Sequence, residues 1–166
     1  MKSMKVRWDL RRRYRAFSEP SRNVVSLVSS CISDEANGVT LDEVLLLVTD
    51  RTCRFCDLEL KLDPAHRAGG PIALGDPSIS QDEVESEVSE TEHVLWWYES
   101  GTRVLQVVLG NDPVERWTML RGGEVIIGLG ANQSLRVVHC QGLVSDPSGK
   151  LQSEWLQDAR QGKPSP

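Results

Sequence analysis

The chain has 166 residues, of which 39% are apolar and 26% charged, and its formal net charge is −5. This length and apolar content suit one folded domain of ordinary size and exclude a fully disordered chain. No stretch reaches the roughly 18 uncharged apolar residues of a membrane span, and the basic N-terminus lacks the apolar segment of a signal peptide. We therefore expect a cytoplasmic or nuclear protein, neither membrane-spanning nor secreted.

Residues 1–22 form a basic N-terminal arm, with eight Lys or Arg against two acidic residues and a net charge of +6. Arginines there are interleaved with aromatic rings, a combination that suits phosphate contact and base stacking. We predict a polyanion-binding arm, with nucleic acid as the first choice, formed by Arg7, Trp8, Arg11, Arg12, Arg13, Tyr14 and Arg15. In a second interpretation, the arm neutralises the acidic run at 82–92, within the chain or between chains.

A helix is predicted to begin near the end of the arm. Ser18 can cap its N-terminus, Pro20 suits its first turn, and Asn37-Gly38 suits its end. Apolar side chains between these points recur at helical spacing, at positions 24, 25, 28, 31 and 32.

Residues 41–62 have two interpretations. Thr40 and Glu43 resemble a capping box, which would open the first helix of a helix-turn-helix. Against this, residues 56–62 alternate strictly between apolar and charged side chains, which is typical of a strand with one wet face. We favour a β-hairpin with strands at 44–49 and 53–62.

The remainder is predicted to be a linker, a sheet and a helix. Pro and Gly interrupt residues 63–77, and the acidic stretch up to 92 has little apolar content, so 63–92 is expected to be a flexible acidic linker. Gly and Asn turns then separate five short apolar segments between 93 and 140, which predicts an antiparallel meander. A closing helix is predicted over 150–161, with Leu151, Trp155 and Ala159 on one face.

These elements together predict an α+β fold, predominantly an antiparallel β-sheet with an N-terminal helix and a C-terminal closing helix. The predicted organisation is the arm at 1–22, a single α+β domain at 23–142 interrupted by the linker at 63–92, and a C-terminal helix and tail at 143–166.

A zinc site is one candidate for bound metal. Cys53 and Cys56 form a C-x2-C pair on the predicted hairpin, and His66 and Cys140 would complete four ligands. In a regular strand, however, residues three apart face opposite sides, which disfavours joint ligation by the pair. No other cofactor is expected, and the absence of any standard catalytic motif favours a protein that is not an enzyme.

Trp96 and Trp97 are neighbours on a predicted strand, so their side chains face opposite ways and one of them is a candidate protein interface. We expect a non-enzymatic regulatory or adaptor protein whose β-rich body contacts a protein partner or associates with itself. The alternatives are a structural protein that forms homo-oligomers and a zinc-stabilised regulatory module. The Arg-rich composition suits a viral accessory protein.

Overall fold

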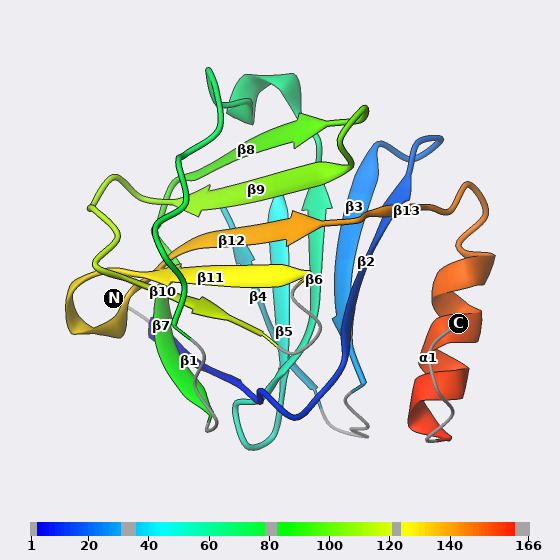
Figure 1. The fold of residues 1–166 in the computed structure, drawn as a ribbon, viewed down its shortest axis with the longest axis horizontal. Helices are drawn as coiled ribbons and strands as arrows, with labels where there is room; N and C mark the ends of the chain where they lie inside the picture. The colour runs from blue at the N-terminus through cyan, green and yellow to red at the C-terminus, as the bar shows by residue number, and fades with distance from the viewer. Residues whose placement is uncertain (1–2, 31–35, 79–82, 121–123, 162–166) are drawn as a thin grey trace.

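The computed structural model describes residues 3–30, 36–78, 83–120 and 124–161. Its strands form three sheets (Figure 1). The largest sheet has the order β13-β2-β3-β6-β5-β4 and contains β2 (Tyr14–Glu19), β3 (Val24–Ser29), β4 (Ala36–Leu41), β5 (Leu45–Asp50), β6 (Phe55–Lys61) and β13 (Val144–Ser145). All of its pairs are antiparallel except β13 with β2.

The second sheet is five-stranded and entirely antiparallel, with the order β10-β11-β12-β9-β8. Its strands are β8 (Val94–Glu99), β9 (Val104–Leu109), β10 (Arg116–Met119), β11 (Val125–Leu129) and β12 (Leu135–Gln141). Consecutive strands pair as the meander prediction requires, with one exception: β9 pairs with β12 instead of β10. This leaves β8 and β10 as the two edges of the sheet.

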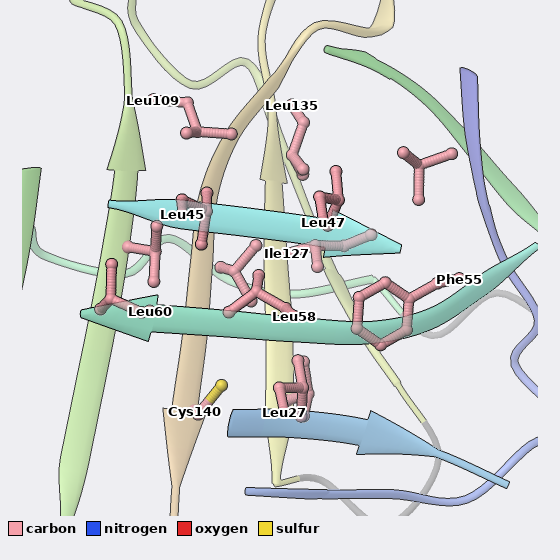
Figure 2. Close-up of a cluster of buried hydrophobic side chains, with 14 of the residues drawn as sticks. Leu27, Leu45, Leu47, Phe55, Leu58, Leu60, Leu109, Ile127, Leu135 and Cys140 are labelled. Atoms are coloured by element: carbon pink, nitrogen blue, oxygen red, sulfur yellow. The ribbon is translucent and has the colours of Figure 1, made fainter. Parts of the chain in front are cut away.

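The hydrophobic core lies between these two sheets, whose strands cross each other (Figures 1 and 2). Alternation along each strand sends one set of side chains inward: Leu58 and Leu60 of β6 are fully buried, while Asp57 and Glu59 lie on the outer face. The five-stranded sheet contributes Leu109, Ile127, Leu135 and Cys140 to the same core. Crossed packing of two twisted sheets encloses one continuous apolar interior.

The prediction of an N-terminal helix is wrong, and with it the α+β class: the fold is essentially all-β with one C-terminal helix. Residues 24–29 form β3, which is buried on both faces. A strand of that kind has a continuous apolar run and not an alternating one, so its sequence can be mistaken for a buried helix. Residues 31–35 of the predicted helix lie outside the described part of the chain.

The hairpin interpretation of residues 41–62 is confirmed, because β5 and β6 pair antiparallel, and the helix-turn-helix alternative is wrong. The predicted closing helix is also confirmed as α1 (Lys150–Arg160). Both carboxylate oxygens of the buried Asp146 accept first-turn N–H groups of this helix, from Leu151 and Gln152. Trp155 packs α1 onto the outer face of the six-stranded sheet.

The acidic segment is not a linker throughout. Its residues Val84–Ser89 form β7, which pairs antiparallel with β1 (Ser3–Trp8) as the third, two-stranded sheet. Val84, Ser86 and Val88 are buried and the glutamates between them are exposed, which is the alternation of a half-buried strand. The basic arm is likewise built into sheets through β1 and β2.

Residues 69–78, which we call the strap, have no regular secondary structure. They follow a short 3-10 helix (Pro64–His66) and cross the outer face of the five-stranded sheet from β8 to β10 (Figure 1).

Candidate functional site

The aromatic rings predicted to stack on bases are in the protein core. Trp8 is fully buried, its ring lies 4.4 Å from that of Phe55, and its Nε1 donates a hydrogen bond to Ser86 Oγ at 3.0 Å. Tyr14 is also buried and donates its hydroxyl hydrogen to the carbonyl of Asp9 at 2.7 Å. Neither ring faces solvent, so neither can receive a base in this structure.

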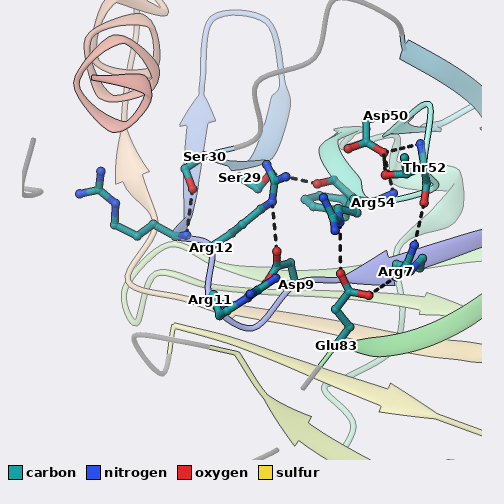
Figure 3. A network of polar contacts seen from close by, with 12 residues as sticks. Arg7, Asp9, Arg11, Arg12, Ser29, Ser30, Asp50, Thr52, Arg54 and Glu83 are labelled. Atoms are coloured by element: carbon teal, nitrogen blue, oxygen red, sulfur yellow. Dashed lines mark hydrogen bonds and ion pairs between the residues drawn. The ribbon is translucent and has the colours of Figure 1, made fainter. Parts of the chain in front are cut away.

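The arginines of the arm have partners within the chain (Figure 3). Arg7 pairs with Glu83, which also pairs with Arg54 at 3.1 Å. Other contacts join Arg11 and Arg12 to Asp9, Arg15 to Glu124, and Arg13 to the carbonyl of Ala159. Of these pairs, only those of Arg7 with Glu83 and Glu85 join the arm to the acidic run, so mutual neutralisation of the two segments is seen at one arginine. Polyanion binding by the arm stays a prediction.

The carboxylate of Asp9 shows how these pairs shape local electrostatics. Burial alone would raise its pKa, but hydrogen bonds from the backbone and side chain of Arg11, together with the charges of Arg11 and Arg12, hold the pKa below its ordinary value. Asp9 therefore stays ionised and fixes the chain between β1 and β2.

The four candidate zinc ligands are not brought together. Cys53 lies in the turn between β5 and β6, Cys56 lies within β6, His66 contacts the carbonyl of Val94, and Cys140 is buried in the core. Burial raises the pKa of the Cys140 thiol to about 12, which disfavours the thiolate that zinc requires. Among the described residues, no three or more His, Cys, Asp or Glu side chains are grouped to hold a metal ion.

The two adjacent tryptophans lie on opposite sides of β8. Trp96 is buried and its Nε1 donates to the carbonyl of Asp63 at 2.8 Å, whereas Trp97 is half-buried. The guanidinium carbon of Arg67 lies 5.9 Å from the centroid of Trp96 and 5.5 Å from that of Trp97. Both rings thus hold one exposed cation by cation–π attraction.

The free edge of β8 is covered along only part of its length. The N–H of Gly110 donates to the carbonyl of His93, so alternation points the backbone groups of residues 94, 96 and 98 away from β9. Side chains cover the backbone groups of Val94: its N–H donates to Asp42 Oδ2, and its carbonyl lies 3.0 Å from His66 Nδ1.

Two residues further along β8, the carbonyl of Trp96 accepts the N–H of Ala68 at 2.7 Å. Within the described residues this cover does not continue to Tyr98. An uncovered strand edge presents N–H and C=O groups that can pair with another extended chain.

A groove of about 410 Å³ opens at this uncovered point, which we call the β8 groove. Its walls come from three segments distant in sequence: the turn between β2 and β3, the end of β6 with the residues that follow, and β8. Its apolar lining comes from Pro20, Val24, Leu62, Trp96 and Tyr98. Such a volume lies in the range of small-ligand and side-chain sites, roughly 300–1,000 Å³.

Two charged side chains line the β8 groove. Glu19 is buried and paired with Arg22 at 3.2 Å. Arg67 is exposed, and its guanidinium makes no ion pair with the described residues. The groove therefore offers an aromatic wall, an open backbone edge and a cation whose N–H donors remain available.

Of these residues, only Trp96 was a predicted site residue. The others belong to segments that come together only when the two sheets pack. No local sequence pattern predicts that packing. The run of apolar and aromatic residues at 94–98 is the one signal that identifies the strand itself.

In the part of the chain that the structure describes, no helix is long and apolar enough to cross a membrane. The chain matches no protein-family model, no curated protein and no solved structure.

Proposed function

We propose that the protein is a non-enzymatic adaptor or regulatory protein that binds an extended segment of a partner protein in the β8 groove. The observation that carries this proposal is the uncovered edge of β8 at Tyr98, which opens into an aromatic-lined groove beside Arg67. An extended peptide added to a sheet edge gains affinity from backbone hydrogen bonds and specificity from side-chain pockets.

The charge at the groove defines the partner's chemistry. Glu19 already has Arg22 as its partner, whereas the guanidinium of Arg67 is positioned by two indole rings and has free N–H donors. Guanidinium groups bind carboxylates through paired, charge-assisted hydrogen bonds. The preferred segment is therefore extended, with an apolar side chain for the groove and an acidic side chain that reaches Arg67.

The lining of the groove supports binding and not catalysis. Among the described residues, neither histidine nor cysteine lines it. A hydroxyl nucleophile there would lack the imidazole base that such a group commonly requires.

Charge reversal at Arg67 is expected to weaken peptide binding at least about tenfold, because a carboxylate would meet a like charge instead of a guanidinium. The measurement is selection of a random peptide library on the full-length protein, followed by titration of the enriched peptides against Arg67→Glu. Arg116→Glu is the matched control, since Arg116 is exposed on β10, the opposite edge of the same sheet.

Binding that survives in Arg116→Glu and is lost in Arg67→Glu would support the proposal. Peptides that bind both variants and the wild type equally would place the site elsewhere, and a library that yields no enriched peptide would contradict peptide binding.

A further inference from the structure

The strap is attached to the five-stranded sheet mainly through backbone contacts. It leaves the β8 edge after Ala68, whose N–H donates to the carbonyl of Trp96, and it reaches β10 at Ser78 (Figure 1). There, the N–H of Ser78 donates to the carbonyl of Trp117 at 2.9 Å, and the carbonyl of Ser78 accepts the N–H of Met119 at 3.3 Å.

Between these two ends, one side chain of the sheet binds the strap backbone. Gln106 on β9 is 2% exposed, and its Oε1 accepts the N–H of Ile72 at 2.7 Å while its Nε2 donates to the carbonyl of Ile72 at 2.9 Å. The same Nε2 lies 3.2 Å from Nδ1 of the buried His139 on β12. An amide that binds both backbone groups of one residue recognises an extended chain whatever its side chain.

The strap's own side chains contribute little buried surface. Residues 71–76 are exposed, and even the apolar Ile72 and Leu74 are each 37% exposed. The backbone does approach the sheet closely at Gly75, where an added Cβ would lie 2.6 Å from Cδ1 of Trp117. The surface under the strap therefore requires an extended backbone at the position of Ile72 and a glycine three residues later.

We propose that this outer face, formed by Gln106, His139 and Trp117, is a second peptide-binding site, and that the strap is its occupant in cis. The ligand that exchanges with the strap is an extended segment of another chain with the same two properties, a residue with free N–H and C=O groups and a glycine three positions further on. This site is separate from the β8 groove and does not rest on the function proposed for that groove.

The way the strap is bound favours exchange. Segments with few buried side chains and exposed backbone open locally at a lower free energy than the core. Once the strap lifts, the buried amide of Gln106 loses both hydrogen bonds to Ile72, and these positions become available to an incoming backbone. The strap competes with a free peptide as a covalently attached ligand. The apparent association constant of the peptide is therefore the intrinsic constant multiplied by the fraction of molecules in which the strap is open.

The test uses a peptide that has the strap's own sequence, GGPIALGDPS, carrying a fluorophore and titrated by anisotropy against the full-length chain. Ile72→Pro/Gly75→Val weakens the strap in cis while leaving the sheet unchanged, since proline removes the N–H that Gln106 binds and valine collides with Trp117. We expect this variant to bind the peptide at least about tenfold more tightly than the wild type.

Two matched controls accompany the titration. Ala73→Ser/Asp76→Ser alters exposed strap positions and is expected to bind like the wild type. A peptide with valine at the position of Gly75 is expected to bind Ile72→Pro/Gly75→Val, the opened variant, at least about tenfold more weakly than the original peptide does. The original peptide is expected to lose affinity to the same extent when Gln106→Leu is added to the opened variant. The proposal is overturned if the folded opened variant does not bind the peptide, or if neither change alters its affinity.

If the opened variant does not fold, hydrogen exchange of the wild type tests whether the strap lifts from the sheet. We expect the N–H of Ile72 to exchange through local opening, at least about a hundredfold faster than the N–H of the fully buried Val138 on β12. Equal exchange rates for the two amides would mean that the strap lifts only on global unfolding, and the proposal would be wrong.

Discussion

Replacing Glu92 with alanine is expected to lower the free energy of unfolding by about 2–4 kcal/mol. Glu92 Oε1 lies 2.8 Å from Nη2 of Arg136, whose side chain is only 5% exposed. Nη1 of the same guanidinium donates to the carbonyl of Leu109 at 2.8 Å. Removal of the carboxylate leaves a buried positive charge without its counter-ion, and that is more costly than loss of an exposed pair.

Urea denaturation of a double-mutant cycle separates the interaction energy between Glu92 and Arg136 from the cost of leaving the Arg136 charge buried without a partner. Arg136→Met alone should also destabilise, but the double variant Glu92→Ala/Arg136→Met should lose less than the sum of the two single changes. Lys150→Ala, which removes the exposed partner of Glu154 at 3.9 Å, is the control and should change stability by less than about 1 kcal/mol. Additive effects of Glu92→Ala and Arg136→Met would contradict the assigned pairing.

Asp57→Asn is expected to stabilise the protein at neutral pH by about 1–3 kcal/mol. Burial, and then the charge of Glu59, raise the pKa of Asp57 from 3.8 to about 6, against the opposing hydrogen bond from the Leu58 backbone. One of its oxygens, Oδ1, is buried without a hydrogen-bond partner. The folded protein therefore carries an unfavourable ionised carboxylate above this pKa.

The direction of the pH dependence follows from the raised pKa. Well below pH 3.8 the carboxyl is neutral in both states, and as the pH rises through 3.8 toward about 6 the unfolded state ionises first. The wild type should lose stability over this window, and denaturation curves of Asp57→Asn should lose that slope. Glu59→Gln should reduce the slope only in part. A variant that is less stable than the wild type at neutral pH, or that keeps the slope, would contradict the assignment.

The part of the fold that the sequence predicts is the part encoded by local alternation. Residues 56–62 alternate because β6 has one face in the core and one outside, so a strand was the correct prediction. β3 shows no such signal because both its faces are covered, and its valines at 24, 25 and 28 fit a helical spacing equally well. β-branching was the remaining indication of a strand.

β7 was missed for a different reason. Its buried positions at 84, 86 and 88 do alternate with glutamates, but the surrounding acidic composition suggested a linker. The candidate site was harder still to predict, because Pro20, Arg67 and Tyr98 meet only after two sheets have packed. The arm illustrates the same limit, since its composition was correctly described while the burial of Trp8 depends on distant partners.

The pairing of β1 with β7 also constrains how the chain folds. Ser3 lies opposite Ser89, and the hydrogen bond from Trp8 to Ser86 spans 78 residues of sequence. Contacts this distant close a long loop before they gain any energy, so folds that depend on them reach the native state slowly. During synthesis, β1 cannot pair until β7 has been made. Until β7 is made, the Trp8 indole lacks the hydrogen bond to Ser86, and the edge of β1 that β7 will occupy is open to misassociation.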